Sequence, residues 1–272
     1  MSAENTRRPV LVGLPYDASS SHLHGAADGP PAIRAALRSP AGNWWTEALQ
    51  DLAAPGRLVD AGDLVLPPDA GARQLIETGI GRILDAGGSP IALGGDHSVT
   101  YPILRALGPR HSELTILHFD AHPDLYDRFE DDRWSHACPF ARIREEGLAA
   151  RLVQVGIRAM SGHQREQAAR FGVETIDMRD WTAGARPVLR GPIYASIDLD
   201  GLDPAFAPGV AHREPGGLTV REVIDLIQHL PVPLVGADVV ELNPACDSSG
   251  VTATVAAKLV KELAGRMLYV PG

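Results

Sequence analysis

Three apolar runs of β-strand character each end in a cluster of aspartate and histidine, and this arrangement constrains the fold more than any other feature of the chain. The run at residues 90–93 leads into Gly-Gly-Asp-His-Ser, and the run at 114–119 leads into Asp-Ala-His-Pro-Asp. A third run, at 194–197, ends in Asp-Leu-Asp. The carboxyl ends of strands in an open parallel sheet line one edge, where ligands bind. We therefore expect the three clusters to meet at one sheet edge.

The rest of the chain alternates between strand-like and helix-like segments. Strands are expected at residues 10–14, 58–59, 90–93, 115–119, 152–155, 173–176, 193–197 and 234–240. Helices are expected at 32–37, from a cap at Asp69 to about residue 86, and at 98–107, 135–146, 162–171, 220–229 and 252–263. Right-handed crossovers place such helices over both faces of a sheet. The pattern predicts a three-layer α/β/α sandwich with a mostly parallel sheet, and no linker divides residues 1–272 into more than one domain.

The three clusters supply the side chains of a metal centre. The candidate ligands are His97, Asp120, His122, Asp124, Asp198 and Asp200. A lone Asp-His-Ser is often only a helix cap, but three such clusters at strand ends are hard to explain structurally, since crowded carboxylates repel unless a proton or cation lies between them. Four carboxylates and two imidazoles suit two divalent cations with bridging aspartates. This donor set favours manganese, with nickel or cobalt possible, over structural zinc.

At these motifs the sequence resembles the ureohydrolase family, the binuclear manganese enzymes that include arginase and agmatinase. The matching segments are residues 94–98, 120–124 and 196–200, the last running on through Pro204, Pro208 and Gly209. The resemblance extends from about Val10 to Met267 and is weakest before Asp60. It implies an arginase-like fold and hydrolysis of a guanidino compound to urea and an amine by a hydroxide held between the metals. It also implies a homo-oligomer, commonly a trimer or hexamer.

The resemblance assigns further roles in catalysis. Glu241, in Glu-Leu-Asn-Pro, matches the family glutamate that pairs with the substrate guanidinium, a planar cation suited to a carboxylate. His136 matches the histidine that carries a proton to the leaving amine, and Asp200 accepts a hydrogen bond or proton. Simple capping of a turn by Glu241, or of a helix by His136, is the alternative. Asp96 and Asp238 are expected to orient ligands.

The choice of substrate is less sharply indicated. Segments 124–130 and 208–217 look most like plant-type arginases, whereas Pro139 and Phe140 look more like agmatinases. Arginine differs from agmatine by an α-carboxylate, which Arg213 or Arg158 could bind unless these are surface or subunit-contact residues. We expect L-arginine to be converted to L-ornithine and urea, with agmatine, a guanidino acid or guanidine as the alternative.

Two alternative functions lie outside this family. Asp-Leu-Asp-Gly at residues 198–201 resembles the nucleophile loop of haloacid-dehalogenase-type phosphohydrolases, but Leu202 occupies the place of their hydroxyl residue. A non-catalytic metal-binding subunit is the other alternative. Cys138 is not expected to be a nucleophile with His136, because residues two apart on a helix do not face each other. His22 and His24 are expected to be exposed loop residues.

Composition narrows the partners and the compartment. The formal charge of −9 and a pI near 5.5 argue against nucleic acid or an anionic membrane surface, and are compatible with a small cationic substrate. Two cysteines are too few for a disulfide framework. The segment 1–9 is polar, and no run approaches the ~18 apolar residues of a membrane span. These features predict a cytoplasmic protein.

Overall fold

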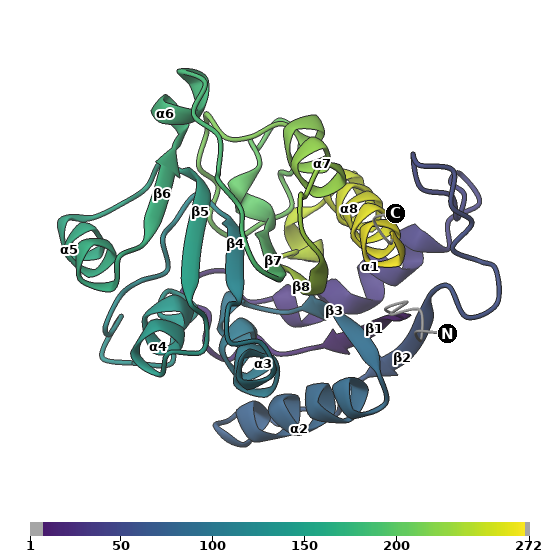
Figure 1. Ribbon diagram of the computed structural model, residues 1–272, viewed down its shortest axis with the longest axis horizontal. Helices are drawn as coiled ribbons and strands as arrows, with labels where there is room; N and C mark the ends of the chain where they lie inside the picture. Colours follow the sequence, from purple (N-terminus) through teal and green to yellow (C-terminus); the bar gives the residue numbers. More distant parts are fainter. Residues whose placement is uncertain (1–7, 270–272) are drawn as a thin grey trace.

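Eight strands form one sheet in the computed structural model, which describes residues 8–269 (Figure 1). The strands are β1 (Arg8–Leu14), β2 (Val59–Asp63), β3 (Gly88–Gly94), β4 (Thr115–Phe119), β5 (Arg151–Ile157), β6 (Glu174–Asp177), β7 (Ile193–Asp198) and β8 (Leu234–Val240). Their spatial order is β2-β1-β3-β8-β7-β4-β5-β6, and every neighbouring pair is parallel. Most of the polar segment 1–9 lies outside the described residues.

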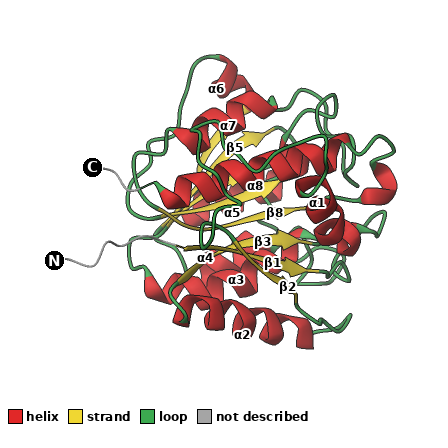
Figure 2. Ribbon diagram, turned by 90° about the vertical axis from the view of Figure 1, so that its right-hand side faces the viewer, coloured by secondary structure: helices red, strands yellow, loops and turns green. Residues whose placement is uncertain are grey.

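Helices cover both faces of this sheet. They are α1 (Gly29–Leu37), α2 (Gly71–Asp85), α3 (Thr100–Leu107), α4 (Pro139–Glu145), α5 (Gly162–Phe171), α6 (Met178–Thr182), α7 (Val220–Gln228) and α8 (Val251–Leu268). Buried side chains of α1, α7 and α8 form the core on one face, and those of α2, α3 and α4 form the core on the other (Figure 2). The predicted three-layer α/β/α sandwich is confirmed.

The alternation of side chains along the strands divides the apolar residues between the two cores. In β3, Ile91 and Leu93 pack into one core, whereas Ala92 between them packs into the other. Because successive side chains in a strand point to opposite faces, a strand covered on both sides must be apolar throughout. This requirement explains why β3, β4, β7 and β8 are almost unbroken apolar runs until they reach the sheet edge.

Several element boundaries differ from those expected. The helix expected at 135–146 begins only at Pro139, which occupies its first turn, and the preceding residues form a turn in which Cys138 N–H donates to the Ser135 carbonyl at 3.0 Å. Proline favours the first helical turn because its missing N–H is not needed there. The turn expected after residue 59 is instead part of β2, and the short helix α6 was not expected.

Helix length and hydropathy also bear on membrane association. None of the helices within residues 8–269 is both long enough and apolar enough to cross a membrane.

Candidate metal centre and active site

The carboxyl ends of β3, β4 and β7 bring all six predicted metal ligands together. One group consists of His97, Asp120, Asp124 and Asp198, and a second consists of Asp120, His122 and Asp200. Within each group the potential ligand atoms lie within 4.8 Å of one another. Asp120 belongs to both groups, as expected for a carboxylate that bridges two cations.

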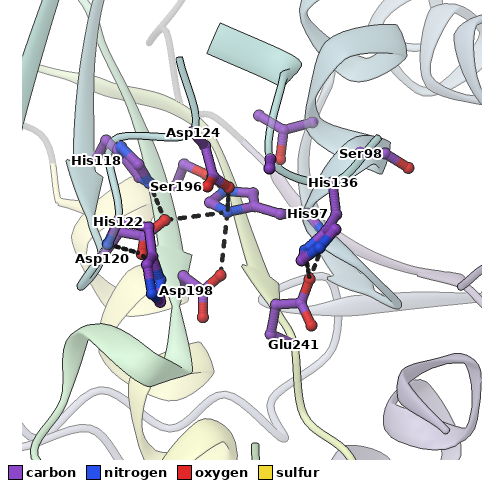
Figure 3. Close-up of polar contacts among 12 residues, drawn as sticks. His97, Ser98, His118, Asp120, His122, Asp124, His136, Ser196, Asp198 and Glu241 are labelled. Atoms are coloured by element: carbon purple, nitrogen blue, oxygen red, sulfur yellow. Dashed lines mark hydrogen bonds and ion pairs between the residues drawn. The ribbon is translucent and has the colours of Figure 1, made fainter. Parts of the chain in front are cut away.

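The hydrogen bonds of His97 show that its Nδ1 atom is available to a cation (Figure 3). Ser196 Oγ donates to Asp238 at 2.7 Å, so it accepts from His97 Nε2, which lies 3.0 Å away. The other ring nitrogen, Nδ1, lies 3.0 to 3.3 Å from carboxylate oxygens of Asp124, Asp198 and Asp120. It is fully buried and makes no hydrogen bond of normal geometry. Among three carboxylates this nitrogen either keeps a proton or, once that proton is lost, can bind a cation.

The pKa shifts within the cluster also favour a bound cation. Burial, together with the negative charges of Asp200 and Asp120, raises the pKa of Asp198 well above its usual range. Burial and the charge of Asp120 likewise raise the pKa of Asp200 to about 7. Burial lowers the pKa of His97, but its carboxylate neighbours outweigh burial and raise the pKa overall. Positive charge is thus favoured at this place, and the residues present fit two divalent cations.

His118 is a site residue that the sequence analysis missed. It is fully buried in β4, its Nε2 lies 2.8 Å from Asp120 Oδ2, and its Nδ1 accepts from Gln154 Nε2 at 3.0 Å. Gln154 also donates to the Pro123 carbonyl at 2.7 Å. The sequence could have revealed this residue, because His118 lies two positions before Asp120 and residues two apart in a strand share a face. His118 therefore fixes the orientation of the Asp120 carboxylate, as a buried hydrogen-bond partner of a metal ligand commonly does.

Two further aspartates, Asp96 and Asp238, lie beside the ligands, and the sequence predicted that they orient them. Asp238 accepts from Thr100 Oγ1 and Tyr194 OH at 2.8 and 2.7 Å, in addition to Ser196. Asp96 accepts the backbone N–H groups of Ser19 and Ser98, each at 3.0 Å. Both side chains are completely buried and fully engaged.

Glu241 and His136 form a pair beside the metal centre (Figure 3). Glu241 Oε1 accepts the His97 backbone N–H at 2.8 Å and lies 3.4 Å from His136 Nδ1. Glu241 has a φ of 67°, in the left-handed region that non-glycine residues rarely adopt and that is often found at functional sites. Burial lowers the pKa of His136, but Glu241 outweighs burial and raises the pKa to about 9.

The metal cluster and this pair face one cavity of about 280 Å³. Its walls are formed by Ser21, His122, Asp124, Tyr126, Phe129, His136, Ala137, Ala159, Ser161, Gln164, Asp198, Asp200, His212 and Glu241. This volume is near the lower end of the ~300–1,000 Å³ typical of small-molecule pockets. His212, which the sequence analysis did not single out, stacks on His136 with ring centroids 5.1 Å apart.

The two arginines considered for binding an α-carboxylate are not in the cavity wall. Arg213 donates to the carbonyls of Pro208 and Cys246 at 2.6 and 3.4 Å. Arg158 is bound to backbone carbonyls, including that of Asp200 at 2.7 Å. The structure therefore brings neither guanidinium into the cavity.

Three side chains that the sequence analysis set aside lie as expected. His22 and His24 are exposed loop residues, although the ring of His22 lies 5.6 Å from that of His212. Burial raises the pKa of the Cys138 thiol to about 12. A thiol that stays protonated at neutral pH is a poor nucleophile.

Proteins that are similar in sequence and structure support the presence of this metal centre. The sequence profile described as "Arginase family" matches residues 7–265. The chain belongs to the arginase family. Membership confirms the ureohydrolase prediction and implies a centre of two divalent metal ions, which the two ligand groups fit. It also removes the phosphohydrolase alternative, because Asp198 and Asp200 are parts of the metal cluster.

Individual relatives share most of the chain. "Arginase 1, mitochondrial" of Arabidopsis thaliana is 45% identical over 275 residues, covering 94% of this chain and 80% of the relative. "Guanidinopropionase" of Pseudomonas aeruginosa is 40% identical, covering 93% and 84%. The solved structure of an arginase from Medicago truncatula superimposes with a TM-score of 0.91 at 42% identity, covering 96% and 88%.

These comparisons contradict the predicted cytoplasmic location. The Arabidopsis relative is named mitochondrial, and a second arginase of that plant is named chloroplastic/mitochondrial. The prediction rested on the small number of cysteines, on the polar segment 1–9 and on the lack of a long apolar run. It was wrong because none of these features specifies the compartment in which a protein works. Reduced thiols do not distinguish one reducing compartment from another.

Proposed function

We propose that the protein hydrolyses L-arginine to L-ornithine and urea with two Mn²⁺ ions. The observation that carries the proposal is the sharing of Asp120 between two groups of ligands beside a cavity that also contains Glu241 and His136. The similarity to proteins named arginase supports arginine as the substrate. The cavity is small and its metal end is rich in carboxylates, which suits a compact cationic guanidino group.

The metal ions would be held by the two ligand groups, with Asp120 common to both. Two divalent cations in such a centre supply Lewis-acid activation of water near neutral pH. The donor atoms are carboxylate oxygens and imidazole nitrogens without cysteine, the set that suits manganese among the candidate metals. Elemental analysis of active protein should find two ions per chain, and one ion per chain would contradict a binuclear centre.

The other site residues bind the substrate and handle protons. Glu241 presents a carboxylate that can accept two guanidinium N–H groups and so fix the orientation of the guanidinium carbon. His136 lies beside Glu241, and its Nε2 lies 2.9 Å from Ser21 Oγ. Because its pKa is raised to about 9, His136 holds a proton at neutral pH that it can give to the departing amine. We assign to Asp200 the acceptance of a proton from the attacking water.

The decisive test compares kcat/KM for L-arginine, agmatine, 4-guanidinobutyrate and guanidine, with manganese and with nickel. We expect L-arginine to be preferred and manganese to support the higher rate. If agmatine exceeds arginine, the arginase assignment is wrong but the ureohydrolase assignment stands. If none of the four compounds yields urea, both fail and a non-catalytic metal-binding role becomes the better explanation.

A second candidate substrate is another ω-guanidino compound, such as a guanidino acid or agmatine. The observation in favour of agmatine is that, among residues 8–269, neither arginine nor lysine lines the cavity, and Arg213 binds backbone carbonyls elsewhere. A relative that is 40% identical is named guanidinopropionase. The same four-substrate comparison distinguishes the candidates.

We also propose a homo-oligomer, a trimer or hexamer. Apolar side chains that are exposed in loops or at a helix start, as expected for a subunit contact, include Leu23, Trp45, Phe206 and Val251. Sedimentation velocity tests the proposal, and a monomer at micromolar concentration would contradict it.

A further inference from the structure

We propose that Ser21 is a positioning residue for the reaction: its hydroxyl holds Nε2 of His136, so that Nδ1 of the same ring faces the leaving nitrogen of the substrate. The proposal rests on the ureohydrolase function proposed above and deepens it, because it adds a residue that is neither a metal ligand nor a partner of the guanidinium. It concerns the step in which the amine departs.

The imidazole of His136 has a different neighbour at each of its two nitrogen atoms. Nδ1 lies 3.4 Å from Oε1 of Glu241 (Figure 3), and Nε2 lies 2.9 Å from Oγ of Ser21. His136 and Glu241 are buried, whereas Ser21 is exposed, and all three line the same cavity. The ring therefore lies between a buried carboxylate and a hydroxyl in the exposed part of the cavity wall.

The protonation state of His136 determines the direction of its hydrogen bonds. Its pKa is raised to about 9, so both ring nitrogens carry a proton at neutral pH. A protonated imidazole can only donate, and Nε2–H therefore donates to the oxygen of Ser21. Hydrogen bonds from charged donors are shorter and stronger than neutral ones, and 2.9 Å is within their usual range. Nδ1–H is left facing Glu241.

The ring of His136 needs a fixed partner once substrate is bound. The second side-chain torsion of histidine is broad and roughly two-fold, so rotation by half a turn would replace each nitrogen by a carbon. Glu241 cannot prevent this rotation while its oxygens accept guanidinium N–H groups. Among residues 8–269, Ser21 is then the hydrogen-bond partner that remains for the ring.

The backbone around Ser21 is itself anchored to the site. On one side, the Ser19 N–H donates to Asp96 at 3.0 Å, and the Ser19 carbonyl accepts the backbone N–H of His136 at 3.1 Å. On the other side, the Leu23 carbonyl accepts from Asn243 Nδ2 at 2.6 Å. Leu23 has a φ of 44°, a conformation that non-glycine residues rarely adopt and that is often found at functional sites. The hydroxyl is thus held in place before substrate binds.

This arrangement specifies the path of one proton. As the bond between the guanidinium carbon and the leaving nitrogen breaks, its electron pair stays on that nitrogen, which takes the proton from Nδ1 of His136. The imidazole is then neutral and keeps its other proton on Nε2, in the hydrogen bond to Ser21. A proton from water returns the ring to its starting state.

The first experiment removes and then restores the hydroxyl. Ser21→Ala should lower kcat for the preferred guanidino substrate about 10-fold, a part of the 10²–10⁴-fold that general acid–base catalysis contributes. KM should change little, because Ser21 is not assigned to the guanidinium. Ser21→Thr keeps a hydroxyl and should recover most of the rate.

The choice of leaving group separates positioning of the acid from a general structural effect. In an isothiourea analogue of the substrate, sulfur replaces the leaving nitrogen. A thiol has a pKa of about 8.5, so its thiolate leaves without first taking a proton, whereas an amine must be protonated as it leaves. Ser21→Ala should therefore lose far less activity with the analogue than with the guanidino substrate.

Ser20→Ala is the matched control. Ser20 is the neighbouring serine, it does not line the cavity, and its hydroxyl makes no hydrogen bond within residues 8–269. This variant should keep the wild-type kcat. An undiminished kcat in Ser21→Ala, an equal loss with the guanidino substrate and its sulfur analogue, or the same loss in Ser20→Ala would overturn the proposal.

A spectroscopic measurement keeps this test separate from the test of the proposed function. In protein loaded with diamagnetic Zn²⁺ and labelled with ¹⁵N-histidine, the ring N–H signals of His136 are those that His136→Asn lacks. Near neutral pH we expect an Nε2–H signal that is protected from exchange with water in the wild type and in Ser20→Ala, and is lost in Ser21→Ala. If no guanidino compound yields urea, the proposed function fails. An Nε2–H signal that is missing from the wild type, or persists in Ser21→Ala, would refute the role of Ser21 whatever the activity.

Discussion

At the scale of single residues, His136 combines a raised pKa with a position next to Glu241 and outside both ligand groups. Replacing His136 with Asn should therefore lower kcat about 10²–10⁴-fold, the usual contribution of general acid–base catalysis. Metal content should stay at the wild-type level, because the substitution removes no ligand. Steady-state kinetics and elemental analysis of the same sample measure both effects.

His229→Asn is the control for this substitution. His229 is the C-cap of α7 and does not line the cavity, so its replacement should leave turnover unchanged. Unaltered turnover in His136→Asn would give His136 a structural role, and a loss of metal would place it among the groups that support the ligands.

At the scale of elements, Arg34 attaches the edge strand β2 to α1. Its buried guanidinium binds Asp60 and Asp63 and donates to the Gly62 carbonyl at 3.0 Å. Burial raises the pKa of Asp60, but the bonds from Arg34 and from the Gly62 N–H outweigh burial and lower it overall from 3.8. A carboxyl whose pKa is lowered by folding stabilises the protein above its unfolded pKa, and this stabilisation is lost as pH falls through the folded pKa.

Asp60→Asn should consequently lower the free energy of unfolding near neutral pH by about 1–3 kcal/mol. The difference from wild type should shrink as the pH drops below about 4, where the unfolded carboxyl begins to bind its proton. Urea denaturation at a series of pH values measures it. Asp85→Asn, which removes an exposed partner of Arg110, should cost less than ~1 kcal/mol. A difference between wild type and Asp60→Asn that does not vary with pH would refute this account of β2.

At the scale of the whole molecule, the metal centre joins three segments that are distant in the sequence. His97 follows β3, Asp120 follows β4 and Asp198 ends β7, so the ligands are assembled only in the folded chain. Metal ions that bind the folded state alone stabilise it, by about 2.7 kcal/mol at a free concentration 100 times the dissociation constant. Removing metal with a chelator should lower the thermal unfolding midpoint, and adding Mn²⁺ should restore it.

Asp120→Asn provides the control, because Asp120 belongs to both ligand groups. Its unfolding midpoint should respond much less to Mn²⁺ than that of the wild type. Equal midpoints for wild-type protein with and without metal would show that the centre does not hold the three segments together.

The sequence by itself determined the layers of the fold and identified six of the side chains that gather in the His/Asp cluster. The apolar runs of β4 and β8 were predicted to the residue, since strands buried on both faces must be apolar throughout. Asp120, His122 and Asp124 were recognisable because polar residues concentrate where such a run reaches the ligand-binding edge. Two features were not predicted: the start of α4 at Pro139 and the pairing of residues 60–63 with β1. The local sequence preference is weak at both places, so tertiary contacts determine the structure there.

Only the tertiary structure decided how the site residues face one another. It turned His97 Nδ1 towards three carboxylates, placed His136 next to Glu241, and added His118 and His212 to the site. It also placed Arg213 outside the cavity wall. Residue types and spacing reveal which chemistry is available, but hydrogen-bond direction and burial arise from segments that meet only on folding.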